Sequence, residues 1–234
     1  MATFAGKGKV AVLKTQPDSI IDDFDRLMRM DGVEAALSKE YTTGLKINIS
    51  WQTWYPACST APWQLEGVIK ALRGMGYEKL LGIHNDTVVV DTRVGEANNK
   101  HKYVTDKYDV PCLYLYEEKF EWIKYQPKTP YMILDKIYPD GVYIPKSLEG
   151  INILHLPTVK THVFTTITGA MKNAFGGLLH RNRHWTHAEI HKTLVDLLMI
   201  QQEIHPGIFA LMDGTFAGDG PGPRAMRWHE KDVI

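Results

Sequence analysis

Three residues whose side chains can bind an anion or transfer a proton follow one apolar segment. Residues 151–156 are mostly apolar, and Lys160, Thr161 and His162 come shortly after them. A lysine ammonium and a threonine hydroxyl can donate hydrogen bonds to anionic oxygens, and histidine can act as a general acid or base because its usual pKa is near neutrality. We expect Lys160 and His162 to be catalytic residues and Thr161 to bind the ligand.

The next segment, 163–179, is predicted to be a helix with one polar face. Polar or small residues recur in it at intervals of three and four, namely Thr165, Thr168, Lys172 and Gly176, with Asn173 beside them. A helix that turns its polar face to water would show the same spacing. Threonine and glycine are poor helix formers, however, which favours a binding role. The expected ligand-binding residues are Thr165, Thr168, Lys172 and Asn173.

A glycine-rich segment, 213–224, follows the apolar run 208–212 and is predicted to be a loop at the end of a strand. Glycines let backbone N–H groups approach a ligand closely. We expect Asp213 to be a third catalytic residue that orients a proton or a cation, and Asp219, Gly220 and Arg224 to bind the ligand. The segment matches neither the dinucleotide-binding nor the phosphate-loop glycine pattern, and a flexible surface loop is the alternative.

Four histidines, at positions 180, 184, 187 and 191, are spaced by four, three and four residues. Thr186 and Glu189 have the spacing of a capping box, so a helix is expected to begin after Thr186 and to carry only His187 and His191. These two histidines could bind a metal ion, or they could be packing or surface residues.

The chain has two cysteines, Cys58 and Cys112, which are expected to be small, partly buried groups or metal ligands. Two thiols exclude a four-cysteine iron–sulfur site within one chain. A metal ion or an iron–sulfur cluster would therefore need a partner protein or a dimer interface. The candidate metal ligands are His187, His191, Cys58 and Cys112.

Lys46 is a charged residue inside the apolar run 45–49, and His84-Asn85-Asp86 closes the run 80–83. Each of them could face a ligand site or reach solvent at an edge. We include Lys46 among the expected ligand-binding residues.

Short apolar runs that alternate with helical patterns predict the fold that positions these residues. The runs are 10–13, 45–49, 80–83, 110–116, 151–156 and 208–212, and the helical patterns include 18–39 with a break at 31–32, 62–75 and 95–107. This alternation is typical of βαβ units. It predicts an α/β fold with an open, mostly parallel sheet and helices on both faces, and such sheets bind ligands at the carboxyl ends of their strands.

Residues 117–146 interrupt this alternation with aromatic residues and prolines. Segments 131–138 and 142–144, on either side of Pro139-Asp140-Gly141, are predicted to form a β-hairpin. We expect an insertion that serves as a lid or a dimer contact within a single domain, 1–234.

Composition narrows the class of protein. Hydrophobic residues make up 44% of the chain, which is typical of a globular protein, and 27 basic residues balance 27 acidic ones. The balance argues against general binding to nucleic acid or to a membrane surface. The first apolar run is too short for a signal peptide or a membrane span, so we expect a cytoplasmic protein.

The sequence resembles domain-of-unknown-function family 362 over most of its length. The matching segments are Lys46-Ile47-Asn48, Ser59 to Pro62, Leu156 to His162, Thr168 to Gly176, Asp213-Gly214 and Gly218 to Pro221. Many relatives carry a ferredoxin-like cysteine-rich segment and are described as iron–sulfur proteins, so the resemblance implies redox work for part of the family. This sequence lacks that segment and ends where relatives usually continue, which implies a short member or one that needs a partner.

Three functions remain open at this point. The first is an enzyme or enzyme-like protein for a small anionic ligand, in which Lys160 and Lys172 hold the anion, His162 transfers a proton, and Asp213 or Asp219 orients it. The second is a non-catalytic metal or iron–sulfur module that docks a redox partner protein. The third is an assembly protein, for example a homo-oligomer, that uses the aromatic insertion as its contact surface.

Overall fold

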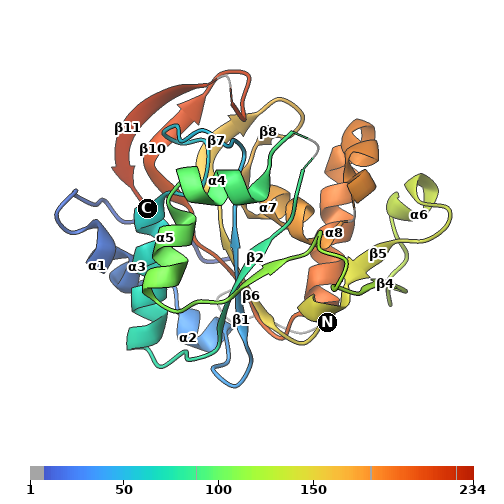
Figure 1. The fold of residues 1–234 in the computed structure, drawn as a ribbon, viewed down its shortest axis with the longest axis horizontal. Helices are drawn as coiled ribbons and strands as arrows, with labels where there is room; N and C mark the ends of the chain where they lie inside the picture. The colour runs from blue at the N-terminus through green and yellow to red at the C-terminus, as the bar shows by residue number, and fades with distance from the viewer. Residues whose placement is uncertain (1–7, 88, 180, 225) are drawn as a thin grey trace.

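The computed structural model describes residues 8–87, 89–179, 181–224 and 226–234, and its centre is a five-stranded parallel sheet (Figure 1). The strands lie in the order β3 (Cys112–Tyr114), β2 (Leu80–His84), β1 (Thr43–Ile47), β6 (Asn152–Leu156) and β9 (Ile208–Ala210). All four neighbouring pairs are parallel. The predicted α/β fold with an open parallel sheet is confirmed.

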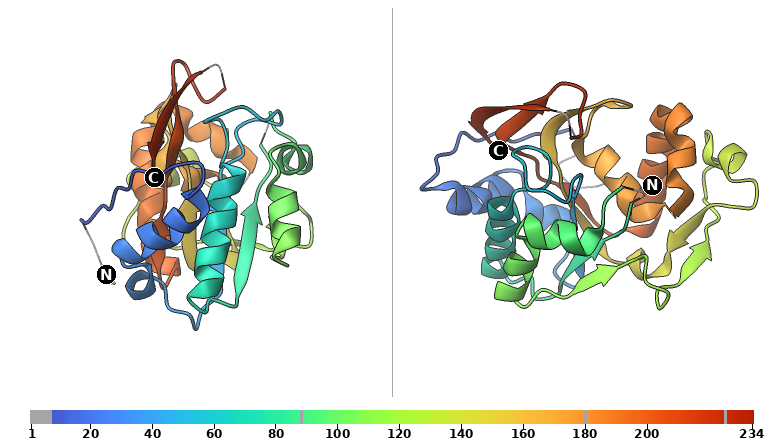
Figure 2. Two further views of the ribbon diagram at one scale, coloured as in Figure 1. Left: turned by 90° about the vertical axis from the view of Figure 1, so that its left-hand side faces the viewer. Right: turned by 45° about the horizontal axis from the view of Figure 1, so that its top comes forward.

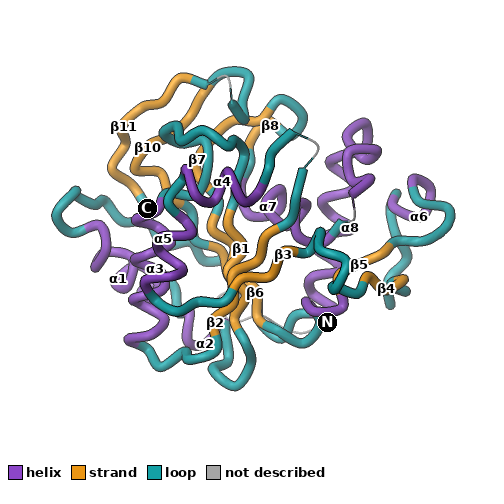
Figure 3. The backbone as a smooth tube through the Cα atoms, in the orientation of Figure 1, coloured by secondary structure: helices purple, strands orange, loops and turns teal. Residues whose placement is uncertain are grey.

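Helices cover both faces of this sheet. Side chains alternate between the faces along each strand, and apolar residues on both faces are buried by these helices. On one face, Leu154 packs in a core with α1 (Ile20–Met30), α2 (Val33–Ala36), α3 (Pro62–Gly74) and α5 (His101–Lys107). On the other face, the neighbouring Ile153 packs with α7 (Gly169–Leu178) and α8 (Ile190–Ile204). The first group lies to the left of the sheet and the second to the right in Figure 3. The predicted break at 31–32 separates α1 from α2.

Two neighbouring strands, β6 and the edge strand β9, lead past the carboxyl edge of the parallel sheet into a second sheet. β6 leads through Pro157 into β7 (Thr158–His162), and β9 leads into β10 (Asp213–Asp219). β7 and β10 pair in parallel, and β8 (Thr166–Ile167) and β11 (Arg227–Val233) flank them in antiparallel pairings. The second sheet therefore projects beyond the strand ends, as both views of Figure 2 show.

This second sheet overturns two predictions. The segment 163–179 is not one helix, because residues 166–167 pair with the end of β7 and α7 begins only at Gly169. The segment 213–224 is not one loop, because its first seven residues form β10. In both places the backbone donors and acceptors of neighbouring strands offered hydrogen bonds that the local sequence pattern did not reveal.

The first apolar run is not a strand of the parallel sheet. Leu13 instead exchanges two backbone hydrogen bonds of 2.9 Å with Ile234, the residue that follows β11. The pattern 95–107 also divides, into α4 (Thr92–Asn98) and α5, at Lys100, whose φ of 66° is left-handed. No helix in the described ranges is long and apolar enough to cross a membrane.

The insertion contains an antiparallel strand pair, but not the hairpin predicted at 131–144. β4 (Trp122–Lys124) pairs with β5 (Tyr143–Pro145), and the short helix α6 (Leu134–Ile137) lies between them in sequence. The buried side chains of Leu134 and Ile144 join the core of α7 and α8. Aromatic residues of the insertion pack against the same core and are partly buried there, namely Trp122, Tyr125, Tyr131 and Tyr138.

A buried carboxylate fastens the insertion to α8. Asp196 accepts hydrogen bonds from the backbone N–H groups of Met132, Ile133 and Leu134 at 2.7, 3.0 and 3.0 Å. Asp196 is only 1% exposed, so removal of its carboxylate would leave these donors without a partner and away from water.

We expect Asp196→Ala to lower the free energy of unfolding by about 2–4 kcal/mol, since it removes three hydrogen bonds to one charged group. Urea unfolding measures the loss. Asp135→Ala, at an exposed position of α6, is the matched control and should change stability by less than about 0.5 kcal/mol. Equal losses in the two variants would show that the carboxylate does not hold the insertion.

Candidate functional site

A cavity of about 420 Å³ lies at the carboxyl ends of β1 and β2. Residues 46–50 and 83–85, with Thr87, form its floor, and α7 and the 3₁₀ segment Arg181–Glu189 form one wall. His162, Pro223 and Arg224 approach from the side of the second sheet. Val89, Val90 and Thr92, at the start of α4, close the opposite side. The volume falls within the range of ligand sites for small molecules.

Several cations, and no carboxylate of the described residues, line the cavity. Its cationic residues are Lys46, Lys172, Arg183 and Arg224, and none of the described residues that line it is an Asp or a Glu. Arg183 and Lys172 lower the pKa of Lys46 by charge repulsion, and Arg183 does the same to Lys172. We call Lys46, Lys172 and Arg183 the cationic cluster.

Lys46 lies in the floor of the cavity. Its side chain is 7% exposed in total, and its Nζ donates to the backbone oxygen of Ile47 at 2.5 Å. Burial, together with the charges of Arg183 and Lys172, lowers the pKa of Lys46 to about 7. Within the described ranges no carboxylate forms an ion pair with this ammonium, so its charge is only weakly compensated near neutral pH.

Two glycines of α7 leave room for Lys46. A Cβ at Gly177 would lie 3.2 Å from Cε of Lys46, and a Cβ at Gly176 would lie 3.7 Å from its Nζ. The small face of α7 that the sequence indicated therefore serves the aliphatic stem and ammonium of this lysine. Asn173 adds a link, since its Nδ2 donates to the backbone oxygen of Lys46 at 2.7 Å.

Lys172 and Arg183 complete the cluster from the helical side. Lys172 is half-buried, with its Nζ 4.3 Å from the ring centroid of Phe175, and burial lowers its pKa to about 8. Arg183 is buried and donates to the backbone oxygen of Asp86. Arg183 was not predicted from the sequence, because its position among histidines does not distinguish a buried arginine from a surface one.

Lys160, predicted to be catalytic, lies behind the cavity rather than in its wall. Its ammonium donates to Oδ1 of Asn48 at 2.8 Å, to Oγ of Ser50 at 2.7 Å, and to the backbone oxygen of Cys58. An ammonium has three donors, so all of them are engaged. Burial lowers the pKa of Lys160 to about 7. This lysine positions Asn48 and Ser50, which do line the cavity.

His162 lines the cavity, and its ring is set by its own turn. Its Nδ1 accepts a hydrogen bond from the backbone N–H of Phe164 at 3.2 Å, which leaves the proton of the neutral ring on Nε2. Burial, with Lys172 and Lys160 nearby, lowers the pKa of His162 to about 4, so the ring is neutral at pH 7. In this state Nε2 can donate a hydrogen bond to a ligand.

The three threonines near His162 bond to the backbone or are enclosed. Thr161 donates to the backbone oxygen of Gly220 at 2.8 Å, and Thr165 donates to that of Ile167 at 2.7 Å. The hydroxyl of Thr168 is buried and has no hydrogen-bond partner in the described structure. Thr165 and Thr168 precede α7, so they do not share a helix face with Lys172.

The glycine-rich segment contributes only its far end to the cavity. Asp213 lies at the start of β10, where its carboxylate accepts from the N–H and the hydroxyl of Thr215, each at 3.1 Å, and burial raises its pKa to about 6. It does not line the cavity. Asp219 pairs with Arg227 and His229 on the outer strands. Gly220, with a φ of 105°, turns the chain back toward Arg224.

The four candidate metal ligands do not come together. His187 stacks between Phe164 and Phe175, at centroid distances of 4.5 and 5.6 Å, and it lies in the 3₁₀ segment, whereas His191 is exposed on α8. The expected helix start after Thr186 is thus wrong, since Thr186 donates to the backbone oxygen of Arg183 and α8 begins at Ile190.

The cysteines are equally separate. Cys58 donates to the backbone oxygen of Pro223 at 3.1 Å, and Cys112 lies on β3 beside Val110. Burial raises the pKa of both thiols, which opposes the thiolate form that metals bind. Among the described residues no three potential ligands form a metal site, and the residues do not fit an iron–sulfur cluster, which needs four thiolates or their equivalent. His180 lies outside the described residues.

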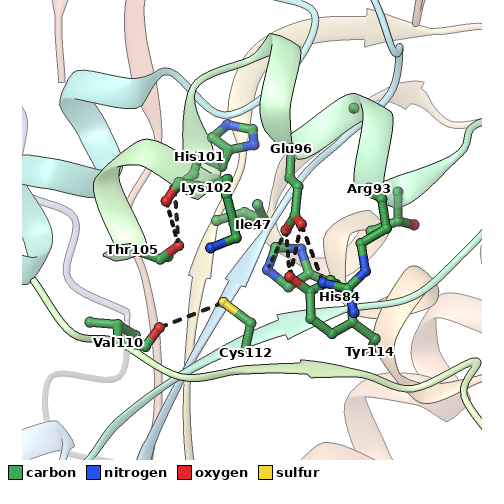
Figure 4. Close-up of polar contacts among 12 residues, drawn as sticks. Ile47, His84, Arg93, Glu96, His101, Lys102, Thr105, Val110, Cys112 and Tyr114 are labelled. Atoms are coloured by element: carbon green, nitrogen blue, oxygen red, sulfur yellow. Dashed lines mark hydrogen bonds and ion pairs between the residues drawn. The ribbon is translucent and has the colours of Figure 1, made fainter. Parts of the chain in front are cut away.

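A second polar cluster, shown in Figure 4, supports the cavity from the α4 side. The hydroxyl of Tyr114 donates to both carboxylate oxygens of Glu96 at 2.8 and 2.9 Å, and the ring of Tyr114 stacks on His84 with centroids 5.1 Å apart. The guanidinium of Arg93 lies 3.2 Å from the Tyr114 centroid. Burial lowers the pKa of His84 to about 3 and raises that of Glu96. This cluster ties α4 to the ends of β2 and β3.

A family model described as "Domain of unknown function (DUF362)" matches residues 43–234, which include all the strands of both main sheets and all the residues that line the cavity. No curated protein and no solved structure matches the chain.

The first prediction from this geometry concerns Gly177. An alanine normally stabilises a helix relative to glycine by about 0.5–1 kcal/mol, but here the new methyl group would press on Cε of Lys46. We expect Gly177→Ala to give no gain in thermal stability. Gly74→Ala is the control, because a Cβ at this position of α3 meets nothing within 4 Å, and it should raise stability. An equal gain in both variants would mean that Lys46 does not rest on Gly177.

The buried lysines should make the free energy of unfolding depend on pH. Lys46 and Lys160 have pKa values of about 7 and Lys172 of about 8 in the folded chain, against 10.5 for an ordinary lysine. Between these values the unfolded chain binds more protons, so the free energy of unfolding must rise with pH. We expect it to increase from pH 7 to pH 9, by on the order of 1 kcal/mol per pH unit or more.

Urea unfolding at pH 7, 8 and 9 measures this rise, and Lys172→Met should show a smaller one. Higher pH is avoided because burial raises the pKa of Cys112 to about 11, from 9.0, and this difference acts with the opposite sign. Stability that is flat or falls from pH 7 to pH 9 would contradict the buried, weakly compensated state of the lysines.

Proposed function

The chain belongs to the DUF362 family, and from the charge and shape of its cavity we propose that it is an enzyme-like protein that binds a small anion at the carboxyl ends of its parallel strands. The observation that carries the proposal is the cationic cluster in a cavity that no carboxylate lines in the described part of the chain. Lys172, Arg183 and Arg224 bind the anionic group, Lys46 contacts it from the floor, and His162 donates a hydrogen bond from Nε2.

The energetics of burial support this function. Charges that are removed from water are costly unless they are paired, and buried charges in proteins are normally paired or neutralised. In the described structure the ammonium of Lys46 donates to a backbone oxygen and that of Lys172 lies over an aromatic ring, and neither of these groups carries a full negative charge. An anion in the cavity would supply that charge and would raise the pKa of both lysines toward ordinary values.

The same groups indicate what chemistry the site could perform. A lysine with a pKa near 7 is partly neutral at physiological pH, so Lys46 can accept a proton or act as an amine nucleophile. The guanidinium groups of Arg183 and Arg224 are planar sets of donors that suit carboxylate or phosphate oxygens. His162, as a neutral ring with its proton on Nε2, polarises a ligand oxygen. The metal or iron–sulfur module has no ligand set in the described structure to support it.

Anion binding can be tested by calorimetry and thermal shift with inorganic phosphate, acetate and phenylacetate in a zwitterionic buffer at pH 6.5. We expect at least one of them to bind. Lys172→Met should weaken that binding about 10- to 100-fold, because a hydrogen bond to a charged group is worth about 1.5–3 kcal/mol. Binding should also weaken from pH 6.5 to pH 9, since Lys46 and Lys172 lose their protons over this range.

The control is Lys136→Met, which removes an exposed lysine of α6 that does not line the cavity. It should bind as the unmodified protein does, with the same dependence on pH. The proposal fails if no anion binds, or if binding is the same in Lys172→Met as in the unmodified protein.

A further inference from the structure

The cationic cluster lies at one end of the cavity, beside α7 and the 3₁₀ segment, and Ile49, Val89 and Val90 line the other end, near α4. From these two ends we propose that the ligand is an organic acid with an apolar body, rather than a bare inorganic anion. The inference rests on the proposed function and names the class of ligand. The acid group meets the cationic cluster at α7 and the 3₁₀ segment, and the body lies toward α4 against Ile49, Val89 and Val90.

Size is the first argument. A cavity of about 150 Å³ is large enough for benzene, and ligand sites for small organic molecules begin at about 300 Å³. The cavity here measures about 420 Å³. A phosphate or an acetate ion, with only a handful of non-hydrogen atoms, would leave most of this volume to water or empty space. A molecule with an acid group and a body of ring size fills it better.

The distribution of apolar residues is the second argument. The apolar residues that line the cavity are Ile47, Ile49, Ile83, Val89, Val90, Phe175 and Pro223. Ile49 and Val90 lie together, since a Cβ at Gly95 of α4 would come within 2.7 Å of the first and 3.6 Å of the second. Val89 is exposed beside them, and large apolar side chains next to a cavity mouth gain from contact with a ligand.

The separation of the two ends is the third argument. The members of the cationic cluster lie close enough to lower one another's pKa, and they come from β1, α7 and the 3₁₀ segment. Ile49 and Val90 adjoin Gly95 of α4 instead. An inorganic anion would use one end only. An amphipathic acid uses both, because its acid group and its body need different surroundings.

The test compares ligands that contain the acid group, the body or both. Phenylacetate has both, acetate has only the acid group, and benzyl alcohol has only the body, while phenyl phosphate and inorganic phosphate repeat the comparison with a second acid group. We expect phenylacetate or phenyl phosphate to bind at least tenfold more tightly than acetate or inorganic phosphate respectively, and tenfold corresponds to about 1.4 kcal/mol. Benzyl alcohol should not bind detectably. The tighter of the two aromatic acids identifies the preferred acid group.

Two variants assign the ends. Val89→Ser should reduce the advantage of the aromatic acid over the small anion about threefold to tenfold and should leave the binding of the small anion unchanged. Its exposed position makes loss of the fold a minor concern, and the thermal midpoint without ligand checks it. Lys172→Met should weaken the small and the aromatic acids by the same factor, because it removes a contact with the acid group.

The possible results separate this inference from the proposed function. Equal affinities for small and aromatic acids, both lost in Lys172→Met, would overturn the amphipathic ligand and leave anion binding intact. Binding of the aromatic acid that is insensitive to Lys172→Met would overturn both, since the ligand would then be held elsewhere. Tight binding of benzyl alcohol would show that the apolar end acts alone and would also overturn the inference.

Discussion

The fold brings Lys46 and Lys160 to one edge of a parallel sheet, where no carboxylate of the described residues pairs with them, and most features of the site follow from this constraint. Lys46 and Lys160 are 7% and 4% exposed, and burial brings the pKa of each to about 7. A structural ion pair with a carboxylate would have compensated these charges more simply. The chain instead retains the buried ammonium of Lys46 beside a cavity, and its burial is costly unless a ligand supplies the negative charge.

The two lysines meet the constraint in different ways, and the second sheet explains why. Because β6 continues into β7, Lys160 is carried past the edge of the parallel sheet and reaches the loop after β1, where three neutral acceptors surround its ammonium. Lys46 lies on β1 itself and finds one backbone oxygen. Lys160 therefore links the second sheet to the loop after β1, whereas Lys46 remains able to bind a ligand.

Sequence patterns were sufficient for the parallel sheet, its helices and several of the residues that meet at the strand ends. Periodicity reports local environment, and Lys46, His162, Lys172 and Asn173 stand at positions where a polar residue interrupts an apolar pattern. The same reasoning could not separate Lys160 from Lys46, since the number of acceptors around an ammonium depends on segments distant in sequence. It also assigned Thr165 and Thr168 to a helix that begins later, because the pairing of β8 with β7 is a tertiary event.

The errors at Asp213 and at the histidines have a related cause. Asp213 was predicted to face the ligand because it follows an apolar run, but that run continues into β10, so the point where the strand ends is displaced by seven residues to the turn near Gly220. Among the described residues of this segment, Pro223 and Arg224, beyond that turn, line the cavity. For the histidines, the 3₁₀ geometry of residues 181–189 turns side chains by a different angle per residue than an α-helix does. Arg183 and His187 consequently face the cavity, and His191 faces solvent. The cationic lining of the cavity thus depends on where two strands end and one helix begins. These are the boundaries that local sequence specifies least, because they depend on which backbone groups find partners across the fold.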